Sequence, residues 1–127
     1  MGKKKVKYLL DSNIIIYHLN GDSIATRFIL KHQKDCAISQ ITFIEVLSFD
    51  FTKEEELSVK AMLNSFAVLD IDSNVSAMAV KNRKLKKIRI PDNIIASTAQ
   101  IYNLTLVTRN SSDFASLDLK ILDIHKS

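Results

Sequence analysis

The first apolar stretch of the chain ends abruptly at an acid. Residues 6–10 form a short, mostly apolar run typical of a buried strand, and a second apolar run covers residues 14–19. Asp11, Ser12 and Asn13 separate the two runs. Because these side chains accept hydrogen bonds from free backbone N–H groups, the break predicts a helix start. The pattern therefore predicts a strand followed directly by a helix, with Asp11 between them.

Short apolar runs and helical patterns continue to alternate along the chain. Further strands are expected at 36–39, 67–71, 104–108 and 120–124, with a helical turn at 110–114. Thr52 and Glu55 have the spacing of a capping box. The helices expected between the strands begin near Ser12, Asp22, Gln40, Thr52, Asp72 and Pro91, and the one from Gln40 runs through Phe51.

This alternation of strands and helices predicts an α/β fold. We expect a three-layer sandwich with a mostly parallel central sheet of four to five strands and helices on both faces. A chain of 127 residues suits one domain, 1–127, and two Gly and one Pro leave little room for flexible linkers.

Composition adds weaker constraints. The net charge of +4 mildly favours an anionic partner such as nucleic acid. Cys36 is the only cysteine, so an internal disulfide is excluded and a reducing cytoplasm is the expected location. The basic N-terminus is followed by a segment too short and too polar for a signal peptide or a membrane span, so no membrane association is expected.

Four acids fall where a parallel sheet would bring them together. Asp11 follows the first strand, Glu45 lies in the helix after the second, Asp92 begins the helix that leads into the fourth, and Asp113 follows the fourth. The carboxyl ends of parallel strands meet at one edge, where ligands bind in open α/β sheets. We therefore expect the four carboxylates to converge.

Each acid alone also has a structural interpretation. Asp11, Asp92 and Asp113 suit helix or turn starts, and Glu45 can face solvent. Carboxylates that converge would repel each other, and a divalent cation would relieve that repulsion. Oxygen ligands without spaced His or Cys favour Mg²⁺ or Mn²⁺, and such an ion can activate water to hydrolyse a phosphodiester.

Four ordered segments resemble a known family. Residues 10–13 (LDSN), 41–47 (ITFIEVL), 91–99 (PDNIIASTA) and 106–114 (LVTRNSSDF) are similar to the PIN domain, and within it to the VapC-type toxins of bacterial and archaeal toxin–antitoxin pairs. The resemblance covers nearly the whole chain. Three places depart from the pattern: Ser12 stands where Thr is commoner, Asn93 stands where a small apolar residue is common, and Tyr102-Asn103 replaces a turn that usually contains glycine.

The resemblance implies a function and a site. It implies a Mg²⁺- or Mn²⁺-dependent endoribonuclease whose metal-binding and catalytic acids match Asp11, Glu45, Asp92 and Asp113. The polar residues expected to support this site are Asn13, Thr108 and Asn110.

The resemblance also implies protein partners. Such toxins commonly form homodimers, and a cognate antitoxin lays a helix or extended tail across an apolar groove near the site. Four phenylalanines suit either this groove or the core, namely Phe43, Phe49, Phe51 and Phe66.

The densest charge of the chain precedes Asp92. A solvated helix face is one interpretation of this run, and contact with the phosphates of RNA is the other. The candidate RNA-binding residues are Arg83, Lys84, Lys86, Lys87 and Arg89.

Three alternatives to a toxin nuclease stay open. The chain can be a non-catalytic PIN-fold binding module or a housekeeping RNA-processing nuclease. A phosphatase or phospho-acceptor domain on a similar sheet is disfavoured, because Asn13 stands where those phosphatases usually carry a second acid.

Overall fold

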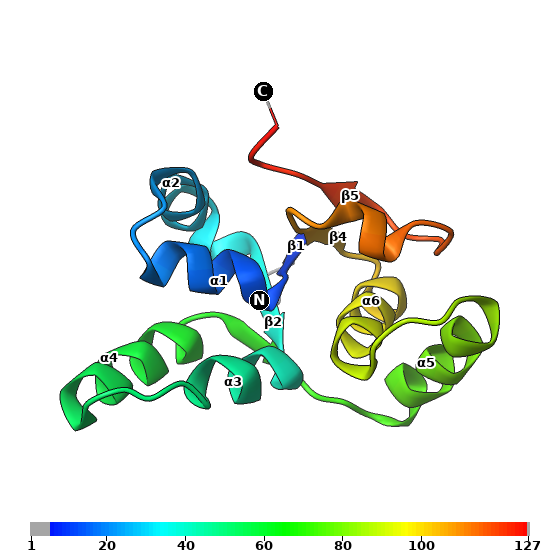
Figure 1. Ribbon diagram of the computed structural model, residues 1–127, viewed down its shortest axis with the longest axis horizontal. Coiled ribbons are helices and arrows are strands. Elements are labelled where there is room, and N and C mark those ends of the chain that lie inside the picture. Colours follow the sequence, from blue (N-terminus) through cyan, green and yellow to red (C-terminus); the bar gives the residue numbers. More distant parts are fainter. Residues whose placement is uncertain (1–5, 127) are drawn as a thin grey trace, which may run out of the picture.

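The computed structural model describes residues 6–126, and its strands form one parallel sheet in the order β3-β2-β1-β4-β5 (Figure 1). The expectation that the N-terminus lacks a signal peptide rests in part on residues 1–5, which lie outside the described part. The strands are β1 Tyr8–Leu10, β2 Cys36–Ser39, β3 Ala67–Leu69, β4 Thr105–Val107 and β5 Ile121–Leu122. The helices are α1 Ser12–Leu19, α2 Ser23–His32, α3 Gln40–Leu47, α4 Lys53–Asn64, α5 Ser73–Leu85 and α6 Ile90–Tyr102, with 3-10 turns η1 Gln33–Asp35 and η2 Ser111–Phe114.

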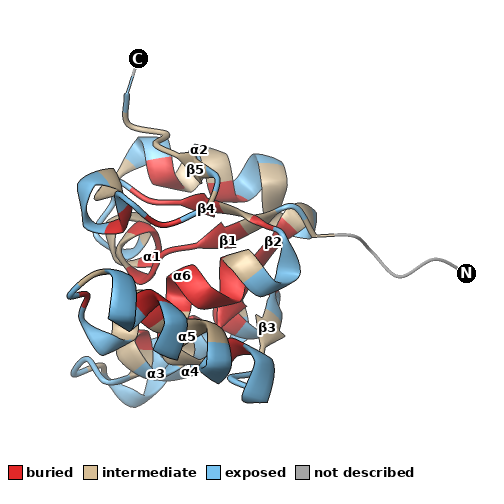
Figure 2. Ribbon diagram, turned by 90° about the vertical axis from the view of Figure 1, so that its right-hand side faces the viewer, coloured by how far each residue is buried: buried red, intermediate tan, exposed pale blue. Residues whose placement is uncertain are grey.

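The helices cover both faces of the sheet, which confirms the predicted three-layer α/β fold. Alternation along each strand explains the layers, since Leu10 and Ile38 pack on the face covered by α1 to α4. Their neighbours Leu9 and Ala37 pack on the opposite face against α6. Figure 2 shows α6 buried beneath α5. Among the described helices, none is both long enough and apolar enough to cross a bilayer.

Helix starts follow the predicted capping residues. Asp22 accepts hydrogen bonds from the N–H groups of Ile24 and Ala25 at 2.9 and 3.1 Å. Thr52 and Glu55 form the expected capping box. At the other end of a helix, Asn103 ends α6 with a φ of 55°, so it adopts the left-handed conformation that a turn glycine would otherwise supply.

Several elements are shorter than predicted: strands β1, β4 and β5 lose one or more residues at their ends, and the largest differences are in α3 and β3. The helix from Gln40 ends at Leu47 rather than Phe51, and the Ser48 hydroxyl donates a hydrogen bond back to the Ile44 carbonyl there. Strand β3 ends at Leu69 because its partner residue, Ser39, is the last of β2 and already caps α3.

A buried amide cluster fixes α5 on α6. The Asn82 amide, 2% exposed, donates hydrogen bonds to Gln100 Oε1 at 2.7 Å and Ser97 Oγ at 3.1 Å, and its third contact is Asn93 Oδ1 at 3.3 Å. Asn93 in turn donates to the Ala79 carbonyl at 2.8 Å. Because an unsatisfied buried amide is costly, these contacts select one register of the two helices.

Replacing Asn82 by alanine is expected to lower the free energy of unfolding by about 1–3 kcal/mol, because buried acceptors lose their donor. Urea denaturation followed by circular dichroism measures this change. The control is Asn74→Ala, on an exposed position of the same helix, which should change stability by less than about 0.5 kcal/mol. Equal losses in the two variants would contradict the role of the amide cluster.

Candidate active site

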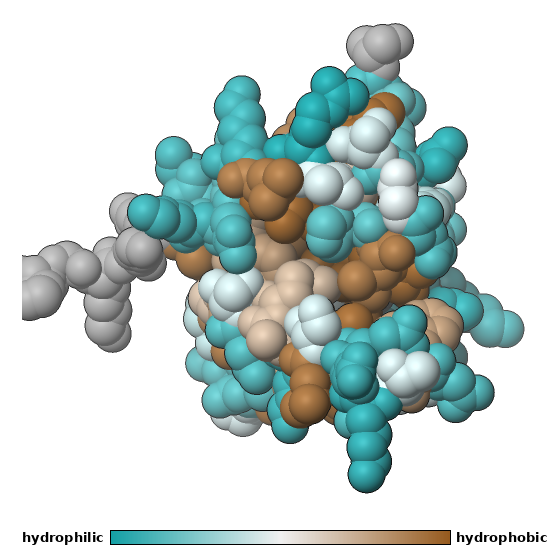
Figure 3. Space-filling view, turned by 90° about the vertical axis from the view of Figure 1, so that its left-hand side faces the viewer, coloured by the Kyte–Doolittle hydropathy of each residue, from teal (hydrophilic) through white to brown (hydrophobic). Residues whose placement is uncertain are grey.

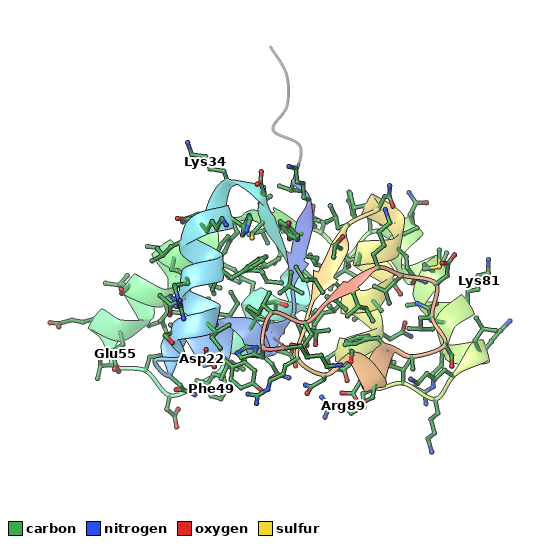
Figure 4. The ribbon with its side chains drawn as sticks, turned by 90° about the horizontal axis from the view of Figure 1, so that it is seen from above. Asp22, Lys34, Phe49, Glu55, Lys81 and Arg89 are labelled. Carbon is green, nitrogen blue, oxygen red and sulfur yellow. The ribbon has the colours of Figure 1, made fainter. Side chains whose placement is uncertain are left out.

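The candidate site lies at the carboxyl edge of the sheet. Strands β1, β2 and β4 run parallel, so the residues that follow them reach the same edge. Figure 4 shows Phe49 and Arg89 at this end of the molecule and Lys34, which precedes β2, at the opposite end.

Asp11 is a buried carboxylate held by a neighbouring strand. It is 3% exposed, and the Thr108 hydroxyl donates a hydrogen bond of 2.7 Å to its Oδ2. Thr108 Oγ1 accepts in turn from the Asn110 N–H at 3.0 Å. Asp11 occupies the N-cap position of α1, but its side chain makes no capping hydrogen bond. The side chain of Asp11 is therefore held by Thr108 rather than by a capping hydrogen bond at the start of α1.

Burial makes the Asp11 carboxyl a weaker acid. Desolvation raises its pKa from 3.8 to about 6, the Thr108 hydrogen bond opposes this shift, and the negative charge of Asp92 adds to it. The ionised form of Asp11 consequently lacks sufficient positive charge around it. A cation at this edge would supply that charge.

Glu45 is half-buried and held by hydroxyl groups. The Ser12 hydroxyl donates to Glu45 Oε1 at 2.7 Å. Because Ser12 has one hydrogen to give, the buried Thr42 hydroxyl at 2.9 Å donates to Ser12. Glu45 thus lies beside Asp11 as expected, and the alternative in which it faces away into solvent does not apply.

Asp11, Glu45 and Asp92 line one hollow of about 340 Å³. The Asp92 side chain is 21% exposed, and its Oδ2 lies 3.4 Å from Nε of Arg89. Phe49, 51% exposed, forms part of the apolar rim of the same hollow. Among the other predicted phenylalanines, Phe66 is 4% exposed and belongs to the core.

A second hollow of about 520 Å³ adjoins the first and shares Asp92 with it. Asp113 lines this second hollow together with Asn110, and Asn13 lines both. The four predicted acids thus reach one edge of the sheet, spread over two adjoining hollows. Within residues 6–126, no three His, Cys, Asp or Glu side chains already form a group that could hold a metal ion.

The candidate RNA-binding residues differ in their contacts, and two of them contact backbone carbonyls. Lys87 and Arg89 are exposed and line the second hollow. Lys84 is exposed on the last turn of α5. Arg83 instead donates a hydrogen bond of 3.1 Å to the Ile88 carbonyl, and the Lys86 ammonium contacts carbonyl groups of η2.

Sequence reasoning did not single out Thr42 as a site residue. Its spacing offered a signal, because a residue three positions before Glu45 lies on the same face of the helix. The contact between Arg89 and Asp92 at the start of α6 also has a signal in the sequence, because residues three positions apart lie on the same face of a helix.

The fold and site define an α/β protein with a parallel sheet and a carboxylate-rich pocket at its carboxyl edge. The PIN domain family model matches residues 8–120. The chain therefore belongs to the PIN domain family, and the resemblance noted from its sequence is confirmed.

Individual relatives agree with this assignment. Ribonuclease VapC2 of Methanocaldococcus jannaschii is 29% identical over 140 aligned positions, which cover 93% of this chain and 94% of that protein. A chain of a toxin–antitoxin complex from Klebsiella pneumoniae is 30% identical with a TM-score of 0.85, covering 95% of this chain and all 100% of that one. A chain of DNA-bound VapBC from Salmonella typhimurium, 23% identical, shares the fold with a TM-score of 0.82 over 94% of this chain and 98% of its own length.

The buried charge of Asp11 predicts a pH-dependent stability. Because its pKa is raised in the folded chain, the folded state binds the proton more tightly, and stability is lost as the pH rises from about 4 through about 6. Asp11→Asn removes the charge. In EDTA we expect this variant to be more stable than the wild type by about 1–3 kcal/mol at about pH 7.5, and the difference to vanish toward about pH 4.

Urea denaturation at several pH values measures this difference. Asp118→Asn, which changes an exposed acid, is the control and should give a difference that does not depend on pH in this way. If Asp11→Asn behaves like the control, the carboxylate of Asp11 carries no desolvation cost.

Proposed function

We propose that the chain is a Mg²⁺- or Mn²⁺-dependent endoribonuclease that hydrolyses RNA phosphodiester bonds, and that it is the toxin of a type II toxin–antitoxin pair. The observation that carries this proposal is the buried, poorly neutralised carboxylate of Asp11, with Glu45 and Asp92 lining the same hollow. The names of the relatives support it, since one is a ribonuclease and others belong to toxin–antitoxin complexes.

The chemistry of the donor set favours a hard divalent cation. Asp11, Glu45, Asp92 and Asp113 would hold it, because carboxylate oxygens are the ligands that Mg²⁺ and Mn²⁺ prefer. When bound, such an ion supplies an activated water and neutralises charge on the phosphate. Since Asp92 now contacts Arg89, a cation must compete with this guanidinium for the carboxylate.

The neighbouring side chains orient the acids. Thr108 fixes one oxygen of Asp11, and Ser12 fixes one oxygen of Glu45, so each carboxylate keeps its other oxygen for a ligand. Asn13 and Asn110 line the second hollow, where their amides can orient water or phosphate. Lys87 and Arg89 lie beside Asp113 and would hold phosphates that flank the cleaved bond.

An antitoxin is the proposed protein partner, and a homodimer is the proposed assembly. Phe49 and Ile44, 51% and 55% exposed, form an apolar rim beside the acids. Figure 3 shows that further hydrophobic side chains are exposed on the face of the molecule that carries α1, α2 and α4. Such a surface suits an amphipathic helix or tail of a partner protein.

A small neighbouring reading frame that encodes a DNA-binding protein would support the assignment as a toxin. The absence of such a reading frame would favour a housekeeping RNA-processing nuclease.

Cleavage of RNA in the presence of Mg²⁺ or Mn²⁺ is the expected activity, and EDTA should abolish it. Asp11→Asn and Asp92→Asn should each lower the rate about 100-fold or more, because each removes a charge that the transition state depends on. Gel analysis of labelled single-stranded RNA measures the rate, and Asp118→Asn is the matched control with unchanged activity.

Calorimetry with Mn²⁺ separates the alternatives. Binding by the wild type, and its loss in Asp11→Asn, is the expected result. A folded wild type that neither binds Mn²⁺ nor cuts RNA would make the chain a non-catalytic binding module.

Lys87→Met should weaken RNA binding and lower its salt dependence. For each lost phosphate contact with single-stranded RNA, the slope of log Kd against log salt should fall by about 0.7. Fluorescence anisotropy in EDTA measures binding without cleavage. Lys60→Met, on an exposed position of α4, is the control, and an equal change in both variants would place the RNA elsewhere.

A further inference from the structure

We infer that Lys86 is a positioning residue that holds the η2 turn, and with it Asp113, at the mouth of the site. We call the contact between the Lys86 ammonium and three backbone carbonyls within residues 112–115 the clamp. The clamp is a property of the fold, whereas its effect on catalysis rests on the proposed nuclease function. The inference assigns to Lys86 a role different from that of its neighbour Lys87.

The contact is made by one ammonium and three backbone carbonyls. Lys86 Nζ lies 2.9 Å from the carbonyl oxygens of Asp113 and Ala115 and 3.3 Å from that of Ser112. An ammonium has three N–H donors, so all of them are used in this contact. None remains for a phosphate group while the clamp is closed.

The position of Lys86 in the chain makes this reach possible. Lys86 is the first residue after α5, with extended backbone dihedrals, and its N–H still bonds to the Asn82 carbonyl at 2.9 Å. Asn82 belongs to the amide cluster between α5 and α6. The clamp therefore starts from a rigid point of the fold.

The η2 turn needs support on its outer side. On its inner side Phe114, 1% exposed, is anchored in the core. Asp113 is on the exposed side, and Ser116 beyond it has a φ of 78°, which non-glycine residues rarely adopt. Carbonyls at the end of a turn carry partial negative charge, so a buried or half-buried cation there forms charge-assisted hydrogen bonds.

The same clamp connects the two segments that line the second hollow, namely the η2 turn and the connection between α5 and α6. Asp113 on η2 and Asp92 near the start of α6 both line it, and Lys86 lies in the connection between α5 and α6 that leads to Asp92. Removing the ammonium leaves Phe114 buried, so the fold should persist. What should be lost is the fixed position of Asp113 relative to Asp92.

Steady-state cleavage of RNA by Lys86→Met and Lys87→Met tests the catalytic consequence. We expect Lys86→Met to lower kcat about tenfold while KM changes less than about twofold, because positioning affects the transition state more than substrate binding. Lys87→Met should raise KM with kcat nearly unchanged. If Lys86→Met instead raises KM alone, Lys86 is a phosphate contact and the inference is wrong.

Amide hydrogen exchange of the full chain, without metal or RNA, tests the clamp independently of activity. We expect faster exchange over residues 112–117 in Lys86→Met, and wild-type protection in Lys87→Met and in Lys86→Arg, which retains charged donors. Unchanged exchange in Lys86→Met would overturn the clamp. If the wild type cuts no RNA but this exchange pattern appears, the proposed function fails and the clamp stands.

Discussion

The hydrogen bond from Thr108 to Asp11 is the constraint on which the site depends. Leu10 pairs with Val107 in the sheet, so the residues that follow them leave adjacent strands side by side. The fold thereby places a carboxylate where it is 3% exposed and gives it one hydroxyl donor. This hydroxyl and the nearby backbone N–H groups of Ser12 and Asn13 are neutral donors, and they offset only part of the cost of burying the charge, since the pKa of Asp11 remains raised. The fold thus accepts an electrostatic penalty at Asp11, which a cation would relieve.

The alternation of strands and helices was enough to predict that the acids lie at the carboxyl edge of a parallel sheet. It was not enough to predict how each acid is oriented there. Asp11 and Asn13 follow an apolar run, and any parallel sheet would bring them to the carboxyl edge. Whether Asp11 caps α1 could not be decided locally, because its partner Thr108 lies 97 positions away. The end of β3 at Leu69 was likewise set by its neighbour strand rather than by its own residues.

The contacts of the basic residues that precede Asp92 could not be predicted from the sequence either. Consecutive cations look alike in a sequence, and periodicity assigns them only to a face of a helix. The structure separates them by what lies opposite: Arg83 faces the Ile88 carbonyl, Lys86 faces η2, and Lys87 borders the open hollow. The first carbonyl that Lys86 contacts, that of Ser112, lies 26 positions later in the chain, so no local pattern could reveal this contact.

The segment from Asn82 to Asn93 joins these features into one support for the site. Asn93 is 1% exposed, and a buried amide without partners would destabilise α6 beside Asp92. Asn82 and the Ala79 carbonyl satisfy it, so the two asparagines form a compensated pair. Because both amides also share Ser97 as a hydrogen-bond partner, the effects of replacing them should be non-additive. The position of Asp92 in α6 therefore depends in part on a polar contact between helices α5 and α6.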